Sequence, residues 1–137
     1  MAEFKVYWQD EAESILMWEY PREYSMNDLM VIGLQVRTML METQAPRIDI
    51  VMVMHNANAT GNNMLTMLNN AYDTMPPQVK SMFFVAPSTF AKLIIRMLDQ
   101  LNEKARKTTH IALSTDAALQ EIAQMRSTDT QATNPTS

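Results

Sequence analysis

Cysteine is absent from this chain of 137 residues, which excludes disulfide bonds, thiolate metal ligands and a cysteine nucleophile. Basic residues are few: the chain has 11 Lys and Arg and 15 Asp and Glu, so its formal net charge is -4. Nucleic-acid binding depends on clustered Lys and Arg that neutralise phosphates, and an acidic chain is not typical of it. We therefore expect neither thiol chemistry nor a nucleic-acid partner.

Long apolar segments are also missing. No stretch is long and apolar enough to span a bilayer, and residues 1–5 lack the charged and apolar regions of a secretory signal. We therefore expect a cytoplasmic protein that is not inserted in a membrane. The chain length and the 47% of hydrophobic residues predict one globular domain over residues 1–126. The polar composition of residues 127–137 predicts a disordered tail.

The most informative segment that is present runs from Arg47 to Met54. It is almost unbroken in its apolar character and is followed by a polar segment from His55 to Asn63. Apolar residues without polar alternation, bounded by turn-forming residues, are typical of a strand buried on both faces of a parallel sheet. This segment predicts an α/β architecture with helices covering both faces.

The rest of the chain predicts four further strands and four helices from its apolar spacing. The strands are expected at residues 4–9, 14–20, 79–86 and 108–113, and the helices at about residues 26–43, 62–74, 88–104 and 115–126. Ser25 and Asp28 resemble a capping box at the start of the first helix. The order β-β-α-β-α-β-α-β-α predicts a mixed sheet of about five strands, with an N-terminal antiparallel hairpin and a parallel core.

Polar side chains follow the predicted parallel strands at their carboxyl ends. They are His55, Asn56, Asn58, Thr60, Ser88 and Ser114. Helix N-termini lie at this edge of a parallel sheet, so the set predicts a site for an anion or for modification of Thr60. The explanation that we favour needs no ligand: the two serines are N-caps and the asparagines are turn residues.

The two histidines are the remaining candidates for chemistry. His55 could act as an acid or base near neutral pH, but the sequence places no nucleophile or orienting carboxylate beside it. His55 and His110 also lack the short spacings of histidine metal sites, so we expect no metal and no cofactor. A non-enzymatic protein is expected, and a small enzyme that uses His55 is kept as an alternative.

Fourteen methionines give the chain its most unusual composition. In the helix at 26–43, one face is shared by Leu29, Ile32, Gly33, Val36 and Leu40, and a second apolar stripe lies about 120° around the helix. We call this second stripe the Met–Leu strip; it consists of Met30, Leu34 and Met41. One face packed on a sheet does not explain both stripes. The Met–Leu strip therefore predicts a homodimer contact or a protein partner, with Arg37 at its polar rim, unless a neighbouring helix covers it.

Three segments resemble the STAS-like domain family, named for sulfate transporters and anti-sigma-factor antagonists, and especially its short bacterial members. They are Trp8-Gln9-Asp10-Glu11, Arg47-Ile48-Asp49-Ile50 and the segment from Ser114 to Ile122, within a resemblance that covers roughly residues 4–124. The resemblance implies a non-catalytic regulatory module that binds another protein. The phosphorylatable serine of the antagonists is not matched, because Thr60 before Gly61 is the only hydroxyl in the corresponding segment.

The methionine-rich composition also allows a different function. A sheet and a methionine-lined helix could enclose a small apolar ligand such as a lipid, because methionine is flexible and polarizable and adapts to irregular shapes. Apolar-ligand binding is therefore the first alternative to the protein-interaction function.

Overall fold

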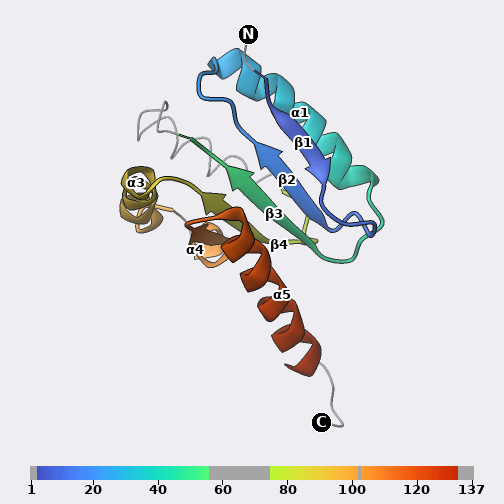
Figure 1. Ribbon diagram of the computed structural model, residues 1–137. Helices are drawn as coiled ribbons and strands as arrows, with labels where there is room; N and C mark the ends of the chain where they lie inside the picture. The colour runs from blue at the N-terminus through green and yellow to red at the C-terminus, as the bar shows by residue number, and fades with distance from the viewer. Residues whose placement is uncertain (1–2, 56–74, 102, 133–137) are drawn as a thin grey trace.

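The computed structural model describes residues 3–55, 75–101 and 103–132 and contains one five-stranded sheet in them. The strands, in spatial order, are β1 (Lys5–Trp8), β2 (Ile15–Glu19), β3 (Ile48–Val53), β4 (Val79–Val85) and β5 (Thr109–Ala112). β1 is antiparallel to β2, and the other neighbouring strands are parallel. The predicted mixed sheet, with its hairpin and parallel core, is confirmed (Figure 1).

The central strand β3 is buried on both faces, as its apolar sequence predicts. It pairs in parallel with β2 on one side and with β4 on the other. Ile48, Ile50 and Val51 are at most 1% exposed. A strand in this position meets a packed layer above and below, which is why it carries no polar alternation.

Apolar side chains form one cluster on each face of the sheet. On one face, Leu16 and Ile50 pack with residues of α1 (Met26–Glu42) and α3 (Ser88–Leu98), including Leu40 and Ile94. On the other face, Met17, Val51 and Phe83 pack with Ile122 of α5 (Thr115–Ala132). Figure 1 shows α1 behind the strands and α5 in front of them. The described helices therefore cover the sheet from both sides.

α1 begins with the capping box that the sequence predicts. The amide of Asp28 donates to the hydroxyl of Ser25 over 3.0 Å, and the amide of Ser25 donates to the carboxylate of Asp28 over 3.1 Å. These bonds satisfy amides that the first turn of a helix would leave without partners. Leu29, Val36 and Leu40 then form the buried face of the helix.

The helix expected at 88–104 is instead two helices, α3 and the short α4 (Glu103–Thr108). The amides of Gln100 and Leu101 bond the carbonyls three residues earlier, those of Met97 and Leu98. Bonds of this spacing tighten the last turn of an α-helix and end it. The apolar spacing alone therefore overestimated the length of α3.

The last helix is longer than the sequence predicts. α5 runs through Ala132, so residues 127–132 are helical, although their polar composition predicted a disordered tail. Once a helix has formed, each added residue gains a backbone hydrogen bond and needs no apolar partner. The C-terminal turns project beyond the sheet (Figure 1). The helix expected at 62–74 lies outside the described residues.

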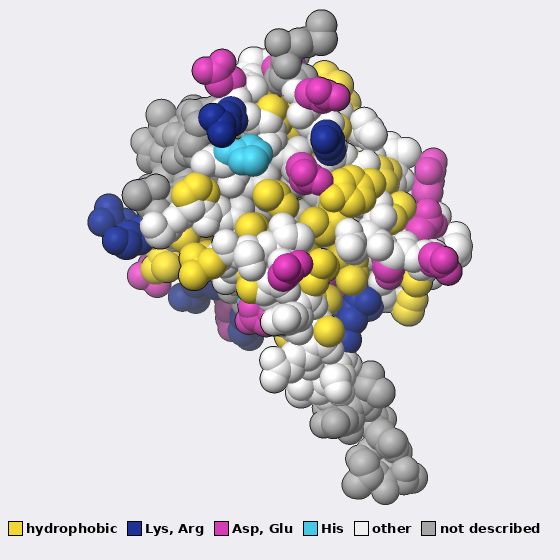
Figure 2. Space-filling view, viewed as in Figure 1, with side chains coloured by type: hydrophobic (Ala, Val, Ile, Leu, Met, Phe, Trp, Pro, Cys, Tyr) yellow, Lys and Arg dark blue, Asp and Glu magenta, His cyan; other side chains and the backbone are white. Residues whose placement is uncertain are grey.

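The surface over the α5 side of the molecule is chemically mixed. Figure 2 shows hydrophobic side chains across the middle of this side, with acidic and basic side chains around them. None of the helices in the described ranges combines the length and the apolar character needed to cross a bilayer.

A pair of neighbouring isoleucines tests the packing of α3. Ile94 is fully buried, whereas Ile95 is 55% exposed. We expect Ile94→Ala to lower the free energy of unfolding by about 2–5 kcal/mol, because it leaves a cavity in the core. The matched control Ile95→Ala should change it by less than about 0.5 kcal/mol. Urea unfolding measures both, and equal effects would show that the helix faces have been assigned wrongly.

Candidate functional site

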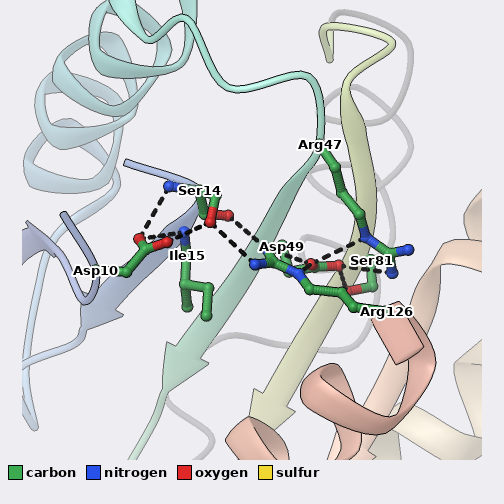
Figure 3. Close-up of polar contacts among 7 residues, drawn as sticks. All are labelled: Asp10, Ser14, Ile15, Arg47, Asp49, Ser81 and Arg126. Carbon is green, nitrogen blue, oxygen red and sulfur yellow. Dashed lines mark hydrogen bonds and ion pairs between the residues drawn. The ribbon is translucent and has the colours of Figure 1, made fainter. Parts of the chain in front are cut away.

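A buried carboxylate lies at the centre of the most densely hydrogen-bonded group of described side chains. Asp49 of β3 is 0% exposed. A buried charge is tolerated only when it is paired and hydrogen-bonded, because removing it from water is costly. Figure 3 shows that its partners converge from β4, from α5 and from the connection that precedes β3. The side chains around Asp49 therefore have to be arranged precisely by the fold.

Asp49 receives hydrogen bonds from Ser81, Arg47 and Arg126. The hydroxyl of Ser81 donates to Oδ1, and the strand register places this residue directly opposite Asp49 on β4. Nε of Arg47 lies 3.2 Å from Oδ2, and Nε of Arg126 lies 2.8 Å from the same oxygen. Two guanidinium groups thus compensate the buried negative charge.

Arg126 also connects α5 to the start of β2. Its Nη1 donates to the hydroxyl of Ser14 and its Nη2 to the carbonyl oxygen of Ser14, each over 3.0 Å. The Ser14 hydroxyl in turn donates to the carboxylate of Asp10. We call this connected group the Asp49 network; it consists of Asp10, Ser14, Arg47, Asp49, Ser81 and Arg126.

Asp10 anchors the turn between β1 and β2. Its Oδ1 accepts hydrogen bonds from the amides of Ser14 and Ile15 over 2.9 and 3.0 Å. Burial alone raises the pKa of Asp10, but the bonds from Ser14 and Ile15 outweigh it, so the pKa of Asp10 lies below its ordinary value. The carboxylate form therefore holds Ser14 in place near neutral pH.

An open pocket of about 570 Å³ lies beside the Asp49 network. It is formed by the β1–β2 turn, the connection from α1 to β3, and α5. Its walls are made by Ala12, Glu13, Ser14, Gln44, Ala45, Pro46, Arg47 and Arg126. This volume falls in the range of small-molecule sites, and the walls combine apolar groups with hydrogen-bond donors.

The pocket lies at the amino ends of β2 and β3, whereas the sequence predicted a site at the carboxyl ends of the parallel strands β3, β4 and β5. There, His55 is exposed two residues beyond the end of β3, and Asn56, Asn58 and Thr60 lie outside the described residues. Within the described ranges, no hydrogen bond joins His55, Ser88 and Ser114 to one another. The anion or modification site expected at this edge therefore stays a prediction.

The N-cap assignments are right for one serine and wrong for the other. The amide of Ala117 donates to the hydroxyl of Ser114 over 3.1 Å, so Ser114 caps α5. Ser88 is instead the first residue of α3, and the capping position is occupied by Pro87, which has no side-chain donor or acceptor.

The second histidine, His110, packs against an aromatic ring in the sheet. The ring of His110 stacks on Phe83 of the neighbouring strand, with ring centroids 4.7 Å apart. In the part of the chain that the structure describes, no group of three or more His, Asp or Glu side chains is placed to hold a metal ion.

The Met–Leu strip is exposed. Met30, Leu34 and Met41 are 68%, 68% and 69% exposed, and Arg37 beside them is exposed as well. No helix in the described part of the chain covers the strip. These methionines also face away from the sheet, so α1 does not use them to enclose a cavity. A role of the strip in binding a partner stays a prediction.

Sequence reasoning missed most of the Asp49 network. An aspartate inside an otherwise apolar strand was the available signal, because such a charge requires partners. Its partner Arg126, however, is 77 residues away and lies on a helix with a weak apolar pattern. Only the folded arrangement brings the two together.

Residues 14–128 match the family model of the divergent CRAL/TRIO domain. The chain belongs to this family. The matched range includes all members of the Asp49 network except Asp10. No curated protein and no solved structure matches the chain.

The resemblance to STAS-like domains is wrong, since CRAL/TRIO domains form a lipid-binding family. The structure explains why the quoted segments misled. Asp10 holds a turn and Ser114 caps a helix, and Ile48 and Ile50 fill the core. Any α/β domain with this order of elements needs such residues, so they indicate the fold and do not distinguish families.

Replacing Arg126 by Met tests the Asp49 network. We expect the free energy of unfolding to fall by about 1.5–3 kcal/mol, the usual contribution of hydrogen bonds to a charged group. Asp49 would keep its hydrogen bonds from Arg47 and Ser81, which limits the loss of unfolding free energy. The exposed Arg106 gives a matched control, Arg106→Met, with an expected change below about 0.5 kcal/mol. Equal losses in urea unfolding of the two variants would contradict the assigned role.

The Met–Leu strip can be tested with the double variant Met30→Glu, Leu34→Glu. If the strip forms a homodimer contact, the two new charges should convert the dimer to a monomer in light scattering, with unchanged circular dichroism. The control Gln35→Glu, Gln120→Glu adds the same charge at exposed positions outside the strip. An unchanged mass of a folded strip variant would exclude the homodimer.

Proposed function

We propose that this CRAL/TRIO domain binds a small lipophilic ligand and has no catalytic activity. The observation that carries the proposal is the family match over residues 14–128, because the family binds lipophilic molecules. The matched range contains β2 to β5 and most of α5, so the proposal concerns nearly the whole described fold.

The pocket beside the Asp49 network supports this proposal. Its volume of about 570 Å³ suits a small molecule, and Ala12, Ala45 and Pro46 give it an apolar wall. Pockets for small molecules are generally apolar, with a few polar groups that fix the orientation of the ligand. The polar groups of its lining come from Glu13, Ser14, Gln44, Arg47 and Arg126.

The burial and hydrogen bonding of Asp49 support a binding function over catalysis. Asp49 is fully buried and its oxygens accept bonds from Ser81, Arg47 and Arg126. A general base has to reach the proton that it removes, within hydrogen-bonding distance. A carboxylate that is enclosed in this way serves to hold the two arginines.

Direct recovery of the ligand tests the proposed function. The purified protein is incubated with a total lipid extract, repurified by size exclusion, denatured and analysed by mass spectrometry. We expect one lipophilic compound, or a few related ones, at close to one equivalent per chain. Recovery of no such compound at a substantial fraction of one equivalent would contradict the proposal.

A pair of tryptophan variants locates the ligand. Ala12→Trp should fill the pocket and reduce the recovered amount several-fold, because Ala12 lines it. Ala117→Trp is the matched control, since Ala117 is also exposed and does not line the pocket. Equal recovery from the two variants would place the ligand elsewhere in the domain.

A further inference from the structure

The positive charge of this acidic chain is concentrated in two neighbouring helices. The segment from Ser88 to Thr108, which contains α3 and α4, has five Lys and Arg and two Asp and Glu. The rest of the chain has six Lys and Arg and thirteen Asp and Glu, so the formal charge is +3 in the segment and -7 outside it. We call the basic side chains of this segment the cationic surface; they are Lys92, Arg96, Lys104, Arg106 and Lys107.

The cationic surface is open to solvent. All five of its residues are exposed. Lys107 forms an exposed ion pair with Glu103 over 3.0 Å, and within the described ranges no ion pair engages the other four basic side chains. Their charge is therefore available to an anionic partner, within the roughly 8 Å over which exposed charges act at physiological ionic strength.

The two helices that carry these charges lie on the same side of the sheet. Ile94 and Met97 of α3 and Ala105 of α4 are buried in one apolar cluster, and four residues connect the helices. Basic side chains appear at the left edge of Figure 2, the side on which Figure 1 places α3. None of the described residues that line the pocket comes from α3 or α4, so the cationic surface is separate from the pocket.

The helix dipole explains only part of the cationic surface. Cations in the last turn of a helix complement its dipole, and Arg96, Arg106 and Lys107 occupy such positions. Lys104 lies in the first turn of α4, where a cation is not favoured, and Lys92 lies in the interior of α3. These two charges therefore call for a role beyond the stability of the helices.

An exposed apolar side chain stands among the cations. Ile95 is 55% exposed and lies between Lys92 and Arg96 on α3. Basic residues next to an exposed apolar residue are typical of helices that lie in a membrane interface, where cations bind the headgroups and apolar groups enter the acyl boundary. An acidic protein or a nucleic acid would match the charge but would not explain the exposure of Ile95.

We propose that the cationic surface docks the domain on an anionic lipid bilayer. Lys92, Arg96 and Lys104 face the headgroups, and Ile95 enters the interface beside them. Anionic lipids attract each nearby Lys or Arg enough to strengthen binding about fivefold, so four or five cations give reversible, salt-sensitive binding without insertion. The preference for a bilayer over another anion rests in part on the proposed function, because a lipophilic ligand is found in membranes.

The full chain is tested by cosedimentation with vesicles of phosphatidylcholine, with and without about 30% phosphatidylserine. We expect the protein to bind the phosphatidylserine vesicles at least about tenfold more tightly than the neutral ones. Raising the salt to about 0.5 M should abolish this difference, because salt screens exposed charges.

Charge variants locate the surface. The double variant Lys92→Gln, Arg96→Gln should weaken binding to phosphatidylserine vesicles at least about tenfold. The matched control Lys5→Gln, Arg37→Gln removes the same charge at exposed positions outside α3 and α4, and it should weaken binding less than about twofold. Circular dichroism checks that both variants are folded.

A third variant tests the apolar contact. Ile95→Ala leaves all charges in place and should weaken binding about threefold, since it removes apolar surface from the interface. Unchanged binding of this variant would contradict the entry of Ile95 into the bilayer and, with it, the choice of a bilayer as the partner.

Several outcomes would overturn the inference without affecting the proposed function. They are equal binding to neutral and anionic vesicles, equal losses in the two double variants, or binding to polyglutamate or a DNA oligonucleotide while phosphatidylserine vesicles are not bound. Recovery of a lipid by mass spectrometry without vesicle binding would likewise leave the proposed function and remove the docking surface. Vesicle binding without lipid recovery would instead remove the proposed function and leave the docking surface.

Discussion

The arrangement of this domain depends on one buried charge. Asp49 lies in the central strand at 0% exposure, where an unpaired carboxylate would be strongly destabilising. Its compensation draws Ser81 from the next strand and Arg126 from α5 into fixed positions. The apolar cluster around Ile122 holds the same helix at its other turns. The polar contact therefore sets where α5 lies along the sheet, and with it one wall of the pocket.

Local sequence patterns predicted the elements that depend on residues close together in the chain. The apolar run of β3 specifies a doubly buried strand, and Ser25 with Asp28 specifies the start of α1. The break between α3 and α4 and the length of α5 escaped prediction. Both depend on backbone bonds near a helix end, such as those of Gln100 and Leu101, which side-chain periodicity does not encode.

The site was harder to predict because its members are distant in sequence. Arg126 and Asp49 are 77 residues apart, and no pattern of spacing relates them. In α/β proteins, ligands usually bind at the carboxyl ends of the parallel strands, and this rule predicted a site at His55 and Ser88. In this domain the Asp49 network and the pocket beside it instead lie at the amino ends of β2 and β3. The aspartate inside the apolar strand β3 indicated where a polar network lies, and the positions of the loops did not.

The Met–Leu strip and the pocket belong to different surfaces but share one helix. The hydroxyl of Thr43, the C-cap residue of α1, donates to the carbonyl oxygen of Glu13 over 2.8 Å, and the amide of Ala45 donates back to the same hydroxyl over 3.3 Å. Thr43 and Ala45 are buried, so the end of α1 and the pocket wall form one packed unit. A molecule bound in the pocket contacts the residues that fix the C-terminal end of α1.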